Sequence, residues 1–159
     1  MWFGATGPMQ YLEGSIQKQS PNFLRTLFDK RKQSRLCILR DGHFMWWDEA
    51  EIEKKGEAKG CISFIVHRAE VFAGSDPNIF GIRPQSGRQW KHTEEKAFTG
   101  KPDREFLFDA EGGEITRDQW VEAIEVHIAF GDGIDRELGE DKCHAIVKTA
   151  KPTLKDVEA

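Results

Sequence analysis

The sequence predicts a mostly β protein: a small antiparallel β-barrel or sandwich of seven strands, capped by one C-terminal α-helix. Short apolar and aromatic runs separated by turn residues fill the chain as far as residue 109, and a helical period begins only after residue 116. A chain of 159 residues, 38% hydrophobic and 31% charged, suits one globular domain. Many short strands leave edges with unpaired backbone N–H and C=O groups unless the sheet closes into a barrel. An amphipathic helix can cover one open end of such a barrel with its apolar face.

Seven runs have the length and composition of strands. The second and third are joined by Asp41-Gly42, a strong hairpin signal. Alternation along the third run places Phe44 and Trp46 on one face and Met45 and Trp47 on the other. The polar stretches between runs are expected to be loops. The predicted strands are 11–18, 35–40, 43–47, 61–66, 69–73, 79–83 and 105–109, and the polar loops include 48–59 and the long insertion 85–103.

One helix is predicted near the C-terminus. Thr116 with Gln119 three residues later forms a capping box, and Gly131 is a natural stop. Apolar residues at three- and four-residue spacings give the helix one buried face, and His127 on that face is expected to pack rather than to catalyse. A domain of residues 9–131 is therefore followed by a polar, acidic tail, 132–159, with a candidate short helix at 142–149.

Basic residues are concentrated in one segment. Residues 18–40 contain seven basic residues and one acidic residue, Asp29, a net charge of +6 that leaves −10 for the rest of a chain whose total is −4. This pattern indicates an anionic partner bound at one place, with a solvated loop paired to acids elsewhere as the alternative. The basic residues are Lys18, Arg25, Lys30, Arg31, Lys32, Arg35 and Arg40.

Composition and motifs argue against several classes of protein. A pI near 5.8 is not typical of a nucleic-acid binder, and no apolar run approaches the roughly 18 residues of a membrane span. Three scattered cysteines and a start without a signal-peptide pattern indicate a cytoplasmic protein. Because metal-ligand spacings, nucleophile motifs and phosphate-cradling loops are missing from the sequence, we expect no metal, no cofactor and no enzymatic activity.

The order of these motifs resembles the pleckstrin-homology domain. Residues 14–18 are similar to its Gly-x-Leu-x-Lys first strand, and residues 35–47 are similar to its second and third strands with their Asp-Gly turn. Residues 59–62 are similar to its Lys-Gly-x-Ile fourth-strand opening, and Trp120 resembles the Trp of its terminal helix. The resemblance covers about residues 9–130 and implies a capped barrel of this type.

The resemblance also implies a site for inositol phosphates in the mouth between the first two strands, where several donors converge on a phosphate. Lys18 and Arg35 match the family's basic positions. Gln33 stands where another basic residue belongs, and Lys32 compensates only if the strand begins with an irregular turn. Trp47 lies near the position of a phosphate-contacting Tyr, and its indole N–H can donate.

Other residues are candidates for weaker or apolar membrane contacts. Lys54 and Lys55 lie on a loop flanking the same mouth, among acidic neighbours. Phe23, Leu24 and Leu27 lie among basic residues of the same loop, an arrangement that suits insertion beneath the headgroups. The alternative for this segment is a short helix that packs its apolar residues onto the barrel, because exposed apolar clusters are costly.

The sequence favours a membrane-targeting module, peripheral to membranes, that binds an anionic phospholipid headgroup. The sequence leaves two headgroups as alternatives, a phosphoinositide and phosphatidic acid. Phosphatidic acid remains an alternative because a monophosphate headgroup needs fewer hydrogen-bond donors than an inositol polyphosphate. The alternative is a protein-interaction or scaffold domain that uses a sheet edge, a groove beside the helix or the long insertion. The residues expected to bind the headgroup are Lys18, Arg25, Lys30, Arg31, Lys32, Arg35 and Trp47.

Overall fold

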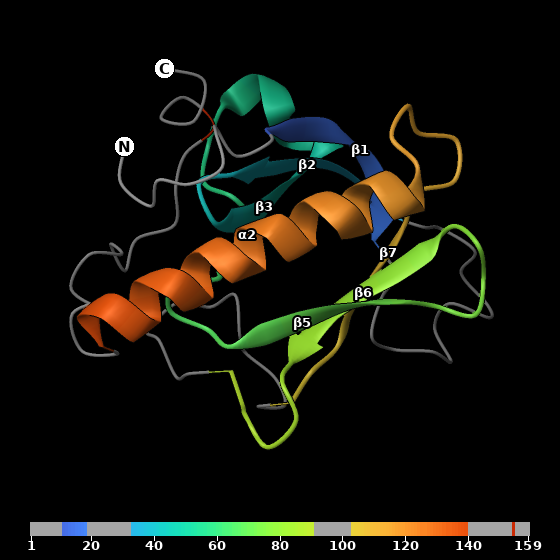
Figure 1. Cartoon of the computed structure of the whole chain (residues 1–159). Coiled ribbons are helices and arrows are strands. Elements are labelled where there is room, and N and C mark those ends of the chain that lie inside the picture. Colours follow the sequence, from blue (N-terminus) through green and yellow to red (C-terminus); the bar gives the residue numbers. More distant parts are fainter. Residues whose placement is uncertain (1–10, 19–32, 91–102, 140–153, 155–159) are drawn as a thin grey trace.

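A computed structural model describes residues 11–18, 33–90, 103–139 and 154, and within them it shows seven antiparallel strands and one long helix (Figure 1). The sheet order is β4-β3-β2-β1-β7-β6-β5. The predicted fold is therefore confirmed. The elements are β1 (Leu12–Lys18), β2 (Gln33–Arg40), β3 (His43–Asp48), the 3-10 helix η1 (Glu49–Lys54), β4 (Gly60–Ser63), β5 (Ala69–Ala73), β6 (Ile79–Pro84), β7 (Phe106–Asp109) and α2 (Arg117–Leu138).

The sheet folds back on itself around one aromatic core. Phe44 on β3 and Phe80 on β6 belong to strands four positions apart, which would be separated by about 19 Å in a flat sheet. Their ring centroids are 6.4 Å apart. Residues of the two halves of the sheet therefore share a single buried cluster, which Trp46, Phe106 and Phe108 complete.

Helix α2 packs against this core between the β1–β3 part of the sheet and the β5–β6 hairpin (Figure 1). The Trp120 ring meets Phe44 edge-on at 5.9 Å. His127 is fully buried, and its Nδ1 accepts a hydrogen bond of 2.9 Å from the N–H of Gly42 in the β2–β3 turn. The predicted packing role of His127 is thus confirmed. Asp41 and Gly42 have φ of 49° and 80°, the positive values that a type I′ hairpin requires.

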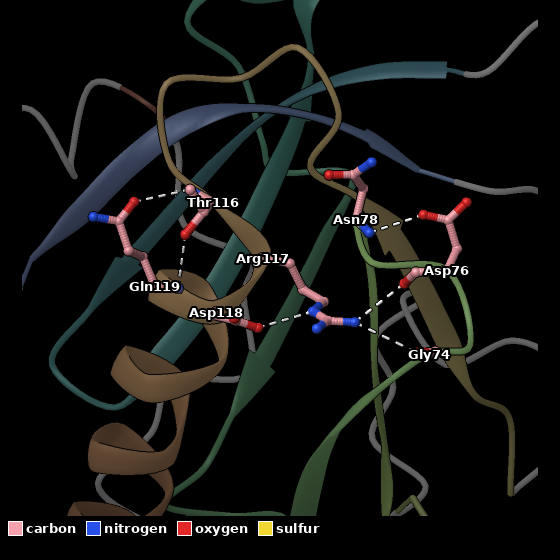
Figure 2. A network of polar contacts seen from close by, with 7 residues as sticks. All are labelled: Gly74, Asp76, Asn78, Thr116, Arg117, Asp118 and Gln119. Atoms are coloured by element: carbon pink, nitrogen blue, oxygen red, sulfur yellow. Dashed lines mark hydrogen bonds and ion pairs between the residues drawn. The ribbon is translucent and has the colours of Figure 1, made fainter.

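The start of α2 is as predicted. Thr116 accepts a hydrogen bond from the Gln119 backbone N–H while the Gln119 side chain accepts one from the Thr116 N–H, which completes the capping box (Figure 2). Arg117, the first helical residue, donates to the carbonyls of Gly74 at 3.4 Å and Asp76 at 3.1 Å. The helix start is therefore fixed to the β5–β6 turn.

The predicted end of the helix is wrong. Gly131 lies inside α2, which continues to Leu138 and is capped by Gly139. A Cβ on Gly131 would stand 2.0 Å from the carbonyl oxygen of Phe64, so this glycine allows close packing of helix on backbone instead of ending the helix. Asp132, one residue further on, pairs with Arg68 at 2.5 Å.

Two other predicted boundaries need correction. The strand predicted at 61–66 ends at Ser63, because the next two carbonyls, of Phe64 and Ile65, accept hydrogen bonds from Arg68. The loop predicted at 48–59 contains η1, which begins where the Asp48 carboxylate accepts from the N–H of Ala50. The candidate helix at 142–149 lies outside the described residues.

In the part of the chain that the structure describes, no helix is both long enough and apolar enough to cross a membrane.

Candidate functional site

Strand register brings two connections to the same end of the sheet. Lys18, the last residue of β1, is the partner of Gln33, the first residue of β2. Asp48, the last residue of β3, is the partner of Arg35. The β1–β2 and β3–β4 connections therefore leave the sheet side by side. Lys18 also pairs with Phe108, so β7 begins at this end as well.

Most of the predicted headgroup residues belong to the first of these connections. Lys18 is described only as the backbone end of β1. The other residues on the β1–β2 connection, both basic and apolar, lie outside the described part of the chain: Phe23, Leu24, Arg25, Leu27, Lys30, Arg31 and Lys32. The register nevertheless fixes the points at which their connection leaves and re-enters the sheet.

Arg35 lies at this mouth on the core face of the sheet. Its β1 partner, Ile16, belongs to the aromatic core, and directly opposed residues of paired strands share a face. Arg35 Nη1 is 3.3 Å from Oδ2 of Asp48, and the two side chains are 10% and 30% exposed. The guanidinium therefore meets a carboxylate at the mouth, which competes with any phosphate for it.

Trp47, predicted to donate to a phosphate, has a structural partner instead. Its side chain is 3% exposed, and its indole Nε1–H donates to the carbonyl of Gly56 at 2.9 Å. Alternation places Trp47 on the outer face of β3, away from the core face that carries Arg35. We correct the prediction accordingly and remove Trp47 from the set of headgroup ligands.

The weaker candidates flank the mouth in a mixed-charge setting. Lys54 ends η1 and Lys55 caps it in a left-handed conformation with φ of 47°, and both side chains are exposed. On the same connection, Glu49 forms a short hydrogen bond with Ser15 of β1. The β3–β4 connection therefore contributes acids as well as bases beside the mouth.

A polar depression that the sequence does not predict lies beside the start of the β6–β7 connection. Arg68, Arg88 and Asp103 are among the residues that line it. Trp90 lies close by, 5% exposed, with its indole N–H donating to the carbonyl of Arg104 at 2.7 Å. Arginines scattered over 68–104 give no local charge signal, which is why only the folded chain reveals this depression.

The described residues bring together no group of three or more His, Cys, Asp or Glu side chains that is placed to hold a metal ion. Near the other end of the β2–β3 hairpin, burial lowers the pKa of His43 below 6.5, despite an opposing contact with the Asp41 carbonyl. On the β5–β6 hairpin, hydrogen bonding to Glu70 raises the pKa of Arg83. Neither group lies at the β1–β2 mouth.

No family model and no curated protein matches the chain. Among solved structures, it is similar to the solution structure of the pleckstrin-homology domain of the human KIAA0053 protein. The sequences are 16% identical, the match covers 81% of this chain and 92% of that chain, and the TM-score is 0.45.

Proposed function

We propose that this chain is a membrane-targeting module that binds anionic phospholipid headgroups at the end of the sheet where β1 and β2 are joined. The binding residues are Lys18 and Arg35 on the strands and the four bases of the connection: Arg25, Lys30, Arg31 and Lys32. Phe23, Leu24 and Leu27 insert beneath the headgroups. The protein acts in the cytoplasm, on the surface of membranes.

One observation supports the proposal: in a chain of net charge −4, the connection that contains Arg25, Lys30, Arg31 and Lys32 leaves and re-enters the sheet at the end that also carries Lys18 and Arg35. A concentrated positive charge attracts an anionic surface, and each base near an anionic leaflet contributes about 1 kcal/mol. Burial of one Phe or Leu adds about 1.5–3 kcal/mol. Several of each reach micromolar affinity without a complete phosphate pocket.

The arrangement of the described residues favours a simple anionic headgroup over a polyphosphate. The indole N–H of Trp47 already donates to the carbonyl of Gly56, and the guanidinium of Arg35 already pairs with the carboxylate of Asp48. Fewer donors therefore remain on the strands for several phosphates at once. The same two contacts favour the alternative function, a protein-interaction or scaffold domain, over tight recognition of an inositol polyphosphate.

Vesicle co-sedimentation tests the proposal. The full chain is mixed with phosphatidylcholine vesicles, and with the same vesicles containing phosphatidic acid or a single phosphoinositide. We expect sedimentation with the anionic vesicles only, and with phosphatidic acid at least as strongly as with a phosphoinositide. Equal binding to neutral vesicles, or binding to none, would contradict the proposal and favour the protein-interaction alternative.

A further inference from the structure

Arg104 is held in one position just before β7 begins. Its carbonyl accepts the indole N–H of Trp90 at 2.7 Å, and its guanidinium carbon lies 4.4 Å from the centroid of the Phe106 ring. Trp90 and Phe106 are both buried, and their rings meet edge-on at 5.8 Å. The core therefore fixes both the backbone and the charged end of Arg104, the latter through a cation–π contact.

Among the described residues, no acid neutralises the guanidinium of Arg104. The residue is half-buried, and its Nε is buried without a hydrogen-bond partner, which carries a desolvation cost. Burial lowers the pKa of Arg104, and no carboxylate opposes this effect. Its two acidic neighbours in sequence are directed elsewhere. Glu105 pairs with Arg83 at 3.4 Å, and Asp103 lines the polar depression, to which Arg104 does not contribute.

Strand pairing brings Arg104 to the β1–β2 mouth. The residues before β7 leave the sheet at the end where β1 finishes with Lys18. Arg104 covers Phe106, whose ring lies 5.4 Å from that of Trp46 on β3. The next residue of β3 on the same face is the carboxylate partner of Arg35. Arg35 and Arg104 therefore lie at the same end of the core, one from each half of the sheet.

We propose that Arg104 is a phosphate-binding residue of this mouth, and that a phosphate monoester is the acidic partner of its guanidinium. A guanidinium stays charged at any physiological pH, and its planar donors bind two oxygens of one phosphate. Arg35 shares its charge with Asp48 at 3.3 Å, whereas no described carboxylate competes for Arg104. The inference rests on the proposed function for the source of the phosphate, a lipid headgroup, and a soluble phosphate ester offers the same chemistry.

NMR detects binding at the Arg104 side chain itself. The isotope-labelled full chain is titrated with glycerol phosphate, the deacylated form of phosphatidic acid, and the arginine Nε–H signals are recorded. Burial of the Arg104 Nε slows exchange of its proton with water, and Arg104→Lys identifies the signal by removing it. We expect this signal to shift until saturation with glycerol phosphate and not with sodium chloride of equal ionic strength. The signal of the exposed Arg88 should not follow it.

Vesicle co-sedimentation tests the role of Arg104 on a membrane. Arg104→Gln is expected to weaken binding to phosphatidic acid vesicles at least about fivefold, the effect of one lost base near the leaflet. Arg88→Gln is the matched control, because it removes the same charge from an exposed arginine of the same β6–β7 connection. This control should bind nearly as wild type does.

The two experiments separate this inference from the proposed function. A saturable shift at Arg104 without vesicle binding by wild type contradicts the membrane function and supports a site for a soluble phosphate ester. Vesicle binding that Arg104→Gln leaves unchanged, or that both variants weaken equally, overturns the role of Arg104 while the membrane function stands. Absence of the shift at Arg104 also overturns it. The titration is made on wild-type protein, so its result does not depend on the folding of a variant.

Discussion

The backbone of Gly131 lies directly on the carbonyl of Phe64, at a distance that leaves no room for a side chain. Replacing Gly131 with Ala should therefore lower the free energy of unfolding by about 1–3 kcal/mol, because helix and backbone must separate. At Gly133, in the same helix, a Cβ would come no closer than 3.9 Å to Arg136. Gly133→Ala should stabilise the protein by up to about 1 kcal/mol through helix propensity. Urea unfolding measures both changes, and stabilisation by both would contradict the packing of α2 on Phe64.

The half-buried His43 should make stability depend on pH. Burial lowers its folded pKa below 6.5, so between that folded pKa and 6.5 the unfolded chain binds more protons. The free energy of unfolding should therefore rise with pH through this window and fall on acidification. Above the window His43 is neutral in both states and its contribution is constant. Urea unfolding of wild type and His43→Asn across this pH range isolates the effect, because all other histidines are shared. Identical slopes would contradict the assignment.

Local patterns predicted much of the fold because each depends on neighbours in sequence. The Asp41-Gly42 turn needs two positive φ angles, and the capping box needs Thr116 and Gln119 three residues apart, so both could be identified without tertiary information. Gly131 could not. Whether a glycine ends a helix or lets it approach another backbone depends on Phe64, which is distant in sequence.

The candidate site was predictable in its charge and not in its contacts. The distribution of charge along the sequence shows the basic segment. The pairing of β1 with β2 shows at which end of the sheet the connection between them leaves and re-enters. The carboxylate beside Arg35 and the carbonyl beside Trp47 depend on register and on the folding of the β3–β4 connection. Sequence spacing cannot predict these two contacts. Both reduce the number of hydrogen-bond donors on the strands that are available to a phosphate.

Asp48 should limit headgroup binding by Arg35. Asp48→Asn removes the ion pair at 3.3 Å, while Asn still caps η1 through its side-chain oxygen. We expect affinity for anionic vesicles to rise about fivefold, the equivalent of about 1 kcal/mol for one released base. Glu53→Gln removes one exposed negative charge from the same connection and serves as the control. An equal rise in both variants would show that net charge, and not Arg35, is responsible.

The contribution of apolar insertion to vesicle binding should persist at high salt. Phe23→Ala combined with Leu24→Ala is expected to weaken vesicle binding at both low and high ionic strength, because burial of apolar surface is not screened. Lys30→Glu is expected to weaken it mainly at low salt. Sedimentation over a salt series separates the two. If the double variant binds like wild type at every salt concentration, these residues do not insert.

The most direct test of the proposed function compares two charge reversals that differ only in place. Arg31→Glu lies on the β1–β2 connection, and Arg136→Glu lies on the exposed last turn of α2. Binding to phosphatidic acid vesicles at low salt should fall at least about fivefold for Arg31→Glu, since each base near the leaflet contributes about 1 kcal/mol. Arg136→Glu should bind nearly as wild type does. Equal losses in the two variants, or none in either, would contradict a headgroup site at the end of the sheet where β1 and β2 are joined.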